Sequence, residues 1–467
     1  MTQLSEPQQG ASPPSQSGLR ISRILSPFTR IMPHESTGAL WLFACVFLIL
    51  VAYYLVKPVR EGWLAVSLFS SLSKLEVKGY SSFLQTVVLI GIMPLYAYYA
   101  NRWSRVRLLT LVGLFFSTLF PLFWLLRPGF LLDNMPFAGL AFYVWVGIFA
   151  VMVIAQFWAY AADLYNEAAG RRLFPFIALG ASIGAVAGSW ITDRLVKALN
   201  LDAYHLLLVA PLPLLVALWI IHHIDRTGHG SARAEKKSLE PAKKGSRGGL
   251  RLIFTDRYLF LIALFMLLLN WVVTNGENIL FAVVQETLKA SLEGLEGESA
   301  SRILRDATTT FYGRLYFWVN LIGVLLQAFV VSRLLRHGGL TALMLTPPLI
   351  SLAGYAAISS LGGITALTWG KTAENAVNYS VTNTARHVLW LPVPQEILYK
   401  AKTAIDTVCV RLGDVLAALT VLAGVRLMAW NTESFFYLNM ALILAWMGVA
   451  VAILRERRRR FPTLGKE

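Results

Sequence analysis

Residues 222–257, HHIDRTGHGSARAEKKSLEPAKKGSRGGLRLIFTDR, form a long polar interruption in an otherwise apolar chain. This segment carries nine Lys or Arg residues together with Gly, Ser and Pro. Six apolar runs precede it and six follow it, and each run is close to the ~20 residues that a helix needs to cross a bilayer. The pattern predicts an all-α membrane protein with twelve transmembrane helices in two pseudo-repeats of six.

The runs and the segments between them define the predicted domains. The runs cover residues 39–56, 80–100, 108–126, 137–162, 173–193, 203–221, 258–284, 308–332, 340–359, 364–390, 403–425 and 433–454. The domains are a cytoplasmic N-terminal tail at 1–38, an N-terminal six-helix half at 39–221, a basic cytoplasmic linker at 222–257, a C-terminal six-helix half at 258–454 and a basic cytoplasmic tail at 455–467. The acidic segment 285–307 is expected to be an external loop with a short helix. We expect residues 1–18 to be disordered, and residues 19–32 to be either a helix on the inner membrane surface or a plain linker.

Composition supports a membrane protein and argues against other classes. Of the 467 residues, 56% are hydrophobic and only 15% are charged, and the mean hydropathy is +0.58. Soluble domains are about 25% charged, so a chain this apolar could not cover itself with polar surface in water. A soluble enzyme, a disordered scaffold and a nucleic-acid-binding module are therefore not expected.

The distribution of Lys and Arg predicts the orientation and explains the net charge of +16 without nucleic acid. With the N-terminus inside, the inner segments hold 27 of these residues and the outer segments hold 11. Inner loops of membrane proteins carry the excess of positive charge. We expect a multi-pass protein of a bacterial inner membrane with both termini in the cytoplasm.

The motifs of the common enzyme and metal sites do not occur in the sequence. It contains no Walker A loop, no Gly-x-Ser-x-Gly, no His-Glu-x-x-His and no Cys-x-x-Cys. The two cysteines, Cys45 and Cys409, lie in apolar runs and are expected to be buried small hydrophobic residues. The chain is therefore not expected to be an enzyme, to hold a cofactor or to bind a metal.

The two halves repeat a basic inner loop. The second run is followed by NRWSRVR at 101–107, and the eighth run, its counterpart, by SRLLRHGG at 332–339. The first loop resembles the Asp-Arg-x-Gly-Arg-Arg loop of major facilitator transporters, with Asn101 and Ser104 in place of the acid and the glycine. Each loop alone is also explained by the positive-inside rule. The pair predicts major facilitator architecture, with a binding site at the midplane between the halves.

Two cations at the end of the first run are candidates for binding a substrate. Lys57 and Arg60 flank Pro58 and lie three residues apart, so they share one face of a helix. If the helix continues past Pro58, both point into the cavity between the halves. If it ends there, both lie at the outer interface beside aromatic anchors.

Other ionisable residues also fall within the predicted spans, where an unpaired charge is costly. Asp163 closes the fourth run and either gates or couples transport, or pairs only with Arg171 or Arg172. Glu277 belongs to a dense polar cluster in the seventh run. Arg314 lies in the eighth run without an acid nearby on its own helix.

The tenth run, WGKTAENAVNYSVTNTAR at 369–386, is too polar to face lipid. Lys371 and Glu374 lie three residues apart and are expected to neutralise one another, while Asn378 adds a donor and an acceptor. Arg386 has no local acid. Arg386 and Arg314 are therefore the best candidates to bind an anion, because Arg presents a rigid fork of donors.

The eleventh run opens with charged residues that can pair within the helix. The two pairs are Lys402 with Asp406, at i and i+4, and Arg411 with Asp414, at i and i+3. Internal pairing is the structural alternative to a role of these residues in binding or gating.

Several stretches resemble the bacterial and plastid ATP/ADP translocases, a group related to the major facilitators. FWAYAAD at 157–163 and RRLFPFIALGA at 171–181 are similar to the family's Phe-Trp-Gly-Phe-Ala-Asn-Glu and Lys-Arg-Phe-Tyr-Pro-Leu-Phe-Gly-Leu-Gly-Ala. The segment 378–413, with KTAID at 402–406 and RLG at 411–413, resembles the family's Lys-Ala-Ala-Ile-Asp and Arg-Leu-Gly-Lys. KPVRE at 57–61 is similar to Arg-x-Leu-Lys-Asp. The resemblance extends over the whole chain.

This resemblance implies transport residues at Arg60, Asp163 and Lys402, with Glu277 as a further acid. The chain departs from the family pattern at other charged positions. Asn378 stands where the family has Lys, and Asn383, His387 and Asp414 stand where it has Asp, Glu and Lys.

The leading hypothesis is a secondary transporter that moves an anionic metabolite by alternating access. A nucleotide exchanged as in the ATP/ADP translocases, or another phosphorylated solute, is the first substrate expected. The first alternative is proton-coupled transport of a different small solute. The second is a membrane receptor or assembly partner that transports nothing. The expected partners are the solute and the lipid bilayer, with no nucleic acid, and the protein is expected to be a monomer.

Overall fold

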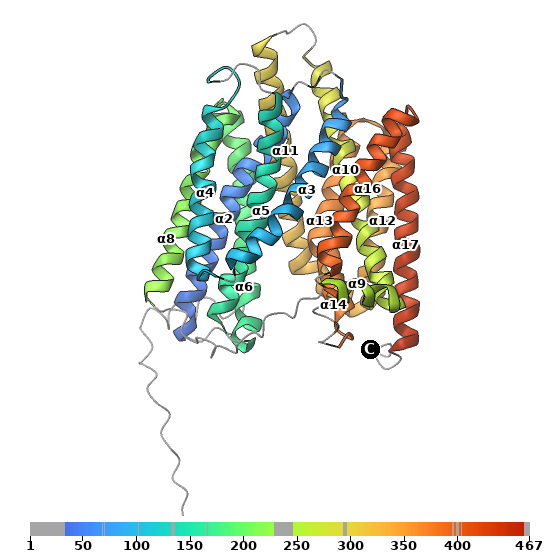
Figure 1. Cartoon of the computed structure of the whole chain (residues 1–467). Coiled ribbons are helices and arrows are strands. Elements are labelled where there is room, and N and C mark those ends of the chain that lie inside the picture. The colour runs from blue at the N-terminus through green and yellow to red at the C-terminus, as the bar shows by residue number, and fades with distance from the viewer. Residues whose placement is uncertain are drawn as a thin grey trace, which may run out of the picture.

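The computed structural model describes residues 33–67, 69, 71–100, 102–131, 136–165, 167–227, 246–292, 297–394, 397, 401–402 and 404–461. These residues form a bundle of long helices (Figure 1). The N-terminal tail up to residue 32, including the predicted surface segment 19–32, lies outside the described residues.

The first half of the chain forms a group of long helices and one short helical connection. The elements are α2 (Pro33–Val66), α3 (Lys74–Ala100), α4 (Arg105–Leu125), α5 (Pro136–Leu164), α6 (Glu167–Ala198), η1 (Ala203–His205), α7 (Leu206–Val209) and α8 (Pro211–Thr227).

The second half is also helical and contains several single π-helical turns, which are typical of functional helices. Its elements are α9 (Ser246–Thr255), α10 (Arg257–Ala290), α11 (Glu298–Leu325), η2 (Leu326–Val330), α12 (Val331–Leu361), α13 (Gly363–Val377), η3 (Asn378–Thr382), α14 (Asn383–Trp390), η4 (Ile405–Cys409), α16 (Val410–Leu422), η5 (Ala423–Leu427) and α17 (Thr432–Arg460).

The all-α membrane class is confirmed, but the count of twelve is not reproduced by length and apolarity alone. Ten helical stretches within the described residues are long and apolar enough to span a membrane. One of them, 298–360, has 63 residues and includes both the eighth and the ninth predicted spans, with a break at Gly339, where φ is 57°. The tenth predicted span is helical as α13, η3 and α14, but it is not among these ten stretches.

Several helices extend beyond the apolar runs that predicted them. Helix α10 continues to Ala290 and α11 begins at Glu298, so most of the expected loop at 285–307 is helical. The described residues show no separate short helix there. Helix α9 lies inside the segment predicted as a linker, and α17 continues to Arg460. Apolar runs mark only the part of a helix that crosses the bilayer core, whereas its hydrogen bonds continue into the polar zone.

Both ends of the described chain lie at the same end of the bundle (Figure 1). We call this the terminal end, and the opposite one, which carries the connection at 199–202 and the end of α10 at Ala290, the distal end. Helix α2 is central and contacts α5, α6, α8 and, in the other half, α11. The halves also meet where α6 packs on α11 and α3 packs on α10 and α16.

A row of glycines on α6 brings it close to α2. A Cβ at Gly180, Gly184 or Gly188 would lie 2.3–2.8 Å from the carbonyl oxygens of Phe43, Phe47 and Val51. These glycines recur every four residues and therefore share one helix face. Backbone-to-backbone packing of this kind holds α2 and α6 together without a hydrophobic driving force.

Candidate functional site

Helix α2 continues through Pro58 to Val66, which resolves the alternative that the sequence left open. Pro58 has no N–H to donate to the carbonyl of Tyr54. The hydroxyl of Thr192 on α6 donates to that oxygen instead, at 3.1 Å. Lys57 and Arg60 are therefore held inside the protein, and each is 8% exposed.

Lys57 is a buried cation surrounded by aromatic rings. Its Nζ lies 3.8 Å from the ring centroid of Tyr316, 5.1 Å from that of Tyr54 and 5.7 Å from that of Tyr53. The Tyr54 hydroxyl donates to Oδ1 of Asn320 on α11, at 3.2 Å. None of the ion pairs found between described residues includes Lys57. Rings attract a cation but do not neutralise it, so Lys57 has no counter-ion in ion-pair contact among the described residues.

Arg60 lies one helical turn further along α2 and shares a single carboxylate with a second cation. Its Nη2 lies 2.6 Å from Oε1 of Glu61, and Lys78 on α3 donates to the other oxygen of Glu61. The Arg60 guanidinium and the Lys78 ammonium both lie over the ring of Tyr143. Two cations on one carboxylate leave this cluster with one excess positive charge.

The second half contributes a cluster of the opposite sign. Lys371 donates to Oε2 of Glu374 at 2.7 Å, so the predicted pair is confirmed. Glu277 on α10 lies 3.8 Å from the same ammonium and accepts a hydrogen bond of 2.8 Å from Nδ2 of Asn375. One cation against two carboxylates leaves this cluster with one excess negative charge.

Together these groups form a charged centre where the two halves meet. The first half supplies three cations and one carboxylate, and the second half supplies one cation and two carboxylates. An anionic group is therefore attracted to the side of α2, and the tyrosines around Lys57 provide flat faces for an aromatic or other planar part of a ligand. The second cluster, with its excess negative charge, attracts a cation.

The other predicted cation of the tenth span pairs with a different helix. Nη2 of Arg386 lies 3.0 Å from Oδ1 of Asp406 in η4. Of the two alternatives for Asp406, pairing with Lys402 on its own helix is not the one found, since the carboxylate pairs with Arg386 of α14 instead. Both members are about one-third exposed. Asn378 is half-buried in η3.

Asp163 lies at the terminal end of the first half, away from the charged centre. Its Oδ2 lies 3.1 Å from Nε of Arg105, and both side chains are exposed, at 52% and 39%. Arg172, one of the two alternative partners that the sequence offers Asp163, forms an ion pair with Glu35 at 3.0 Å. The side chain of Arg171 lies outside the described residues. Asp163 thus joins the end of α5 to the basic loop at 102–107.

The second pair predicted in the eleventh span is confirmed, with additional partners. Nη1 of Arg411 lies 3.2 Å from Oδ2 of Asp414. Asp414 also accepts hydrogen bonds from Thr274 on α10, at 2.7 Å, and from Thr86 on α3, at 3.3 Å. Because α3 belongs to the first half, this carboxylate connects the two halves.

Arg314 is placed on the side of the bundle rather than at its centre. Its Nε lies 3.9 Å from Oδ1 of Asp193 on α6, and its side chain is 54% exposed. As predicted, Arg314 has no acidic partner on its own helix. Its acidic neighbour, Asp193, belongs to the other half.

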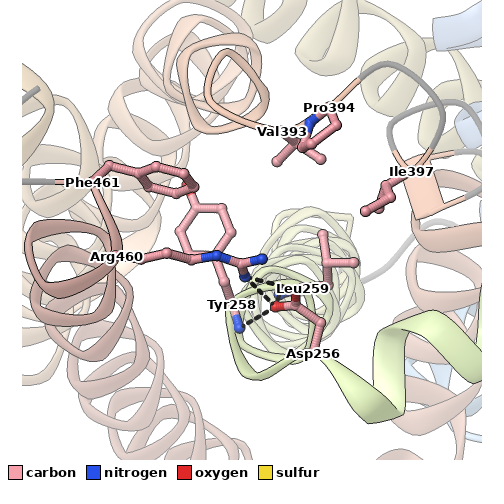
Figure 2. Close-up of a pocket in the computed structure, with 8 residues that line it drawn as sticks. All are labelled: Asp256, Tyr258, Leu259, Val393, Pro394, Ile397, Arg460 and Phe461. Atoms are coloured by element: carbon pink, nitrogen blue, oxygen red, sulfur yellow. Dashed lines mark hydrogen bonds and ion pairs between the residues drawn. The ribbon is translucent and has the colours of Figure 1, made fainter.

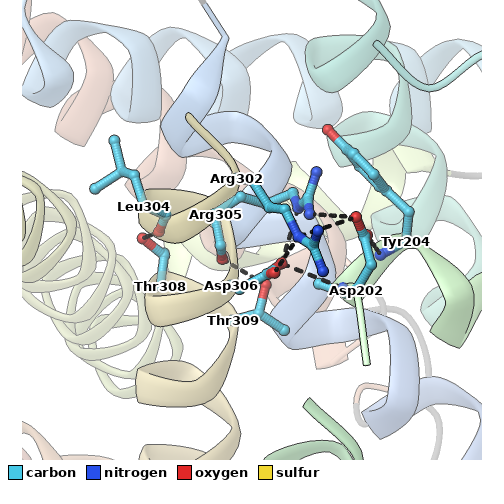
Figure 3. A network of polar contacts seen from close by, with 9 residues as sticks. Asp202, Tyr204, Arg302, Leu304, Arg305, Asp306, Thr308 and Thr309 are labelled. Carbon is cyan, nitrogen blue, oxygen red and sulfur yellow. Dashed lines mark hydrogen bonds and ion pairs between the residues drawn. The ribbon is translucent and has the colours of Figure 1, made fainter. Parts of the chain in front are cut away.

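A network of ion pairs closes the distal end (Figure 3). Nη2 of Arg305, on α11, lies 2.7 Å from Asp202, which precedes η1 in the first half. Arg305 also pairs with Asp306 at 2.9 Å and lies over the ring of Tyr204. Asp306 in turn accepts from the backbone N–H of Ala203.

A second bridge lies at the distal ends of α3 and η5. Arg426 donates from Nε to Oε1 of Glu76 at 2.5 Å and from Nη2 to the carbonyl of Ser71 at 2.6 Å. The ion pairs that join the halves within the described part of the chain lie toward this distal end. The structure is therefore a conformation with its distal end closed.

A small cavity at the terminal end is a structural contact and not a substrate site (Figure 2). Its volume is about 10 Å³, which is close to the least that one water molecule requires. Asp256 caps α10 through the N–H groups of Tyr258 and Leu259, and it pairs with Arg460 at 2.6 Å. Burial raises the pKa of Asp256, but hydrogen bonds from Arg460 and from the two N–H groups lower it by more. The pKa of this carboxyl is therefore below its usual value.

The sequence analysis missed Glu61, Lys78 and the distal acids. Lys78 was counted in an outer loop because the apolar run begins at residue 80, whereas α3 begins at Lys74. Glu61 could have been predicted as a partner of Arg60, because it follows Arg60 directly on a helix that continues past Pro58.

Comparisons with known proteins support a transporter. No family profile matches the chain. The ADP,ATP carrier protein 1 of Chlamydia pneumoniae is 24% identical over 444 residues, which cover 82% of this chain and 83% of the relative. The resemblance to the ATP/ADP translocases is thus confirmed.

Solved structures confirm the major facilitator type of fold. The nucleoside transporter NupG has a TM-score of 0.63 at 11% identity, covering 89% of this chain and 98% of its own. A D-xylose–proton symporter has a TM-score of 0.59 at 13% identity, covering 89% and 97%. A POT family transporter in complex with a conjugated peptide has a TM-score of 0.61 at 14% identity, covering 91% and 96%. The expected class, a secondary transporter and not an enzyme, agrees with these relatives.

Proposed function

We propose that this chain transports an anionic, phosphorylated metabolite, with a nucleotide as the first substrate class to test. The observation that carries this proposal is Lys57, a buried cation at the meeting point of the halves whose contacts are aromatic rings. A buried charge without a counter-ion is costly. A substrate phosphate would supply that counter-ion.

The ADP,ATP carrier named above supports a nucleotide. The tyrosines beside Lys57 also suit a nucleobase, since a flat ring stacks on them while the phosphate reaches the ammonium. Asn378 and Asp414 replace two cations of the translocase pattern. A substrate with fewer phosphate charges than ATP is therefore compatible with this site.

In the proposed cycle, substrate binding at the charged centre and the ion pairs of the distal end favour different arrangements of the same helices. A substrate that binds Lys57 and the Arg60 cluster brings α2 and α11 into a new arrangement, and the pairs Asp202–Arg305 and Glu76–Arg426 must break before the distal end can open. A ligand can drive this change only if it binds the two states differently.

We further propose that the protein lies in a bacterial inner membrane as a monomer, with the terminal end in the cytoplasm. The sequence assigns 27 Lys and Arg residues to predicted inner segments and 11 to predicted outer ones, and three of those 11, Lys57, Arg60 and Lys78, are buried in the charged centre. This excess of positive charge in the predicted inner segments supports the orientation. The conformation described here would then be closed toward the opposite side of the membrane.

Proton-coupled transport is the second candidate, and Asp414 favours it. This carboxylate accepts hydrogen bonds from Thr274 in its own half and from Thr86 in the other half. Protonation of Asp414 would weaken a contact between the halves and so couple a proton to the conformational change.

Transport by purified protein in liposomes tests these proposals. We expect labelled ADP to enter liposomes that contain unlabelled ATP. We expect Lys57→Ala to lower this uptake at least tenfold, while Lys197→Ala, at an exposed site on α6, retains it. Uptake that needs a pH gradient but no internal nucleotide, and that is lost in Asp414→Asn, would support proton coupling instead. If no member of a panel of phosphorylated solutes is transported, the proposal of a phosphorylated substrate is wrong.

A further inference from the structure

A cleft opens between the two halves on the side of the bundle, away from the charged centre. It lies between α6 and α11 and has a volume of about 220 Å³. Its lining residues are Trp190, Asp193, Arg194, Arg314, Phe317 and Trp318.

The geometry of α11 shows that this cleft faces away from the centre. Tyr312 and Tyr316 are buried, and the ring of Tyr316 contacts Lys57. Gly313 contacts α6, since the nearest atoms to a Cβ there belong to residues 189–193. Successive helical positions differ by about 100°, so Arg314 lies on the side of α6 that is opposite to the tyrosines.

The aromatic residues of the cleft agree with this placement. Trp190 is 48% exposed and Trp318 is 38% exposed. The ring of Trp318 lies 5.9 Å from that of Trp369 on α13, which is 49% exposed. In a membrane-spanning bundle, an outer face of this kind contacts lipid.

Charges on such a face require a partner, because lipid chains provide none. The cleft holds two guanidinium groups and one carboxylate. Arg314 and Asp193 are 3.9 Å apart at their closest atoms, which is too long for a hydrogen bond, and Oδ1 of Asp193 accepts no hydrogen bond from the described residues. Arg194 lies over Trp190 at 5.7 Å. The cleft therefore has one excess positive charge and one buried acceptor without a donor.

The depth of the cleft suits a lipid headgroup. Arg194 precedes the end of α6, at Ala198, by four residues, or about 6 Å along the helix. Arginine side chains this close to a helix end extend toward the membrane interface. The guanidinium groups thus reach the level at which lipid phosphates lie.

We propose that this cleft binds an anionic glycerophospholipid of the phosphatidylglycerol type. Arg194 and Arg314 would bind the phosphodiester oxygens, since guanidinium groups match phosphate geometry. A glycerol hydroxyl of the headgroup would donate to Asp193. The acyl chains would lie along Trp190, Phe317 and Trp318. A single negative charge on the lipid balances the excess positive charge of the cleft.

Such a lipid would stabilise the conformation with the distal end closed. Helix α6 belongs to the first half and α11 to the second, so one phosphodiester held by Arg194 and Arg314 would join the halves. The Asp202–Arg305 pair lies nearby, since Asp202 follows the end of α6 by four residues and Arg305 precedes Arg314 by nine residues on α11. The lipid and this ion pair would therefore act in the same direction.

Thermal unfolding of delipidated protein tests this proposal. We would add phosphatidylglycerol, phosphatidylcholine, soluble glycerophosphoglycerol or inorganic phosphate to the purified full-length chain. We expect phosphatidylglycerol to raise the unfolding midpoint of the wild type, and phosphatidylcholine and the two soluble phosphates to leave it unchanged. In the Arg194→Gln/Arg314→Gln variant, we expect affinity for phosphatidylglycerol to fall about tenfold or more, since hydrogen bonds to charged groups are lost.

Lys197→Gln is the matched control, because it removes a positive charge one turn further along α6 and outside the cleft. It should retain the full lipid effect. If the double variant does not fold, Arg194→Gln alone, at an exposed position, replaces it, and retained lipid is counted by native mass spectrometry. Equal effects of phosphatidylglycerol on the wild type and on the cleft variant would overturn the proposal. So would an equal effect of phosphatidylcholine, or a full effect of inorganic phosphate or glycerophosphoglycerol.

Discussion

Lys57 of the first half lies over the ring of Tyr316 of the second half, with 3.8 Å between the ammonium nitrogen and the ring centroid. Both residues are buried, and they lie on α2 and α11, which also meet at the closed distal end. The contact brings a positive charge to the boundary where the halves must move apart. It holds the charge by its ring face without cancelling it, and therefore leaves it available to a ligand.

Replacing Lys57 by Met should separate binding from stability. The loss of one ammonium that contacts a phosphate should lower kcat/KM for the transported anion by about 10- to 100-fold. The thermal midpoint should stay the same or rise, because a buried charge without a counter-ion is removed while the aliphatic chain is kept. Proteoliposome uptake and a thermal unfolding assay measure the two effects. A large fall in stability together with unchanged uptake would show that Lys57 is structural.

Glu61→Gln, unlike Lys57→Met, should lower the stability of the protein. It leaves Arg60 and Lys78 buried without their shared carboxylate, which should destabilise the protein by about 3–5 kcal/mol. Glu433→Gln removes an exposed carboxylate in the first turn of α17 and is the control. Thermal unfolding in detergent measures both variants. Similar midpoints for the two variants would show that the Arg60 and Lys78 charges find other partners.

Local spacing predicted the pairs within helices but not those between them. Lys371 and Glu374, and Arg411 and Asp414, are three residues apart, and helical geometry alone brings them together. Arg386 instead pairs with Asp406 across two helices, and no sequence spacing reports how α14 and η4 are placed.

The charged centre was predicted only in part, because contacts between helices cannot be read from spacing in the sequence. Lys57 and Arg60 could be singled out because charge at membrane depth is costly, and the continuation of α2 placed them inside. The distal network could not be predicted, because Asp202 and Arg305 fall between the apolar runs of the sequence, where charges are ordinary. Only the packing of the first half on the second turns them into a closure.

Arg305→Ala should shift the protein toward a state with an open distal end. It leaves Asp202 and Asp306 without their main cation, and a loss of about 1.4 kcal/mol would change the ratio of the two states tenfold. Spin labels at Leu199→Cys and Ile303→Cys, on opposite halves and exposed, would report the distance between the distal ends. We expect a new population at longer distance.

Arg302→Ala is the control for this measurement. Arg302 is 53% exposed, and its contacts to Asp202 and Asp306 are 3.9 and 3.8 Å long, so its removal should change the distance distribution far less. An equal effect of the two variants would indicate that net charge, rather than the buried pairs of Arg305, holds the distal end closed.

Gly62→Ala should hinder the same closure by steric contact. A Cβ at Gly62 on α2 would lie 2.2 Å from Oγ1 of Thr309 and 2.7 Å from the carbonyl of Arg305, both on α11. The two helices must separate, so we expect lower stability, by about 1–3 kcal/mol, and more of the distally open state. Gly91→Ala, where a Cβ meets nothing within 4 Å, should be neutral or slightly stabilising. A neutral Gly62→Ala would show that α2 and α11 are not tightly packed.

The pair of Asp256 and Arg460 should make stability sensitive to acid. The pKa of Asp256 is lower in the folded chain than its usual value, so the carboxylate contributes stability above the unfolded value of about 3.9. This contribution should be lost as the pH falls below that value and through the lowered folded pKa. Measured from pH 6 to pH 3, the thermal midpoint of the wild type should fall more steeply than that of Asp256→Asn, which carries no titrating group there. The difference should be small, because Arg460 is 41% exposed and water screens the pair. A steeper fall in Asp256→Asn than in the wild type would contradict the sign of this linkage.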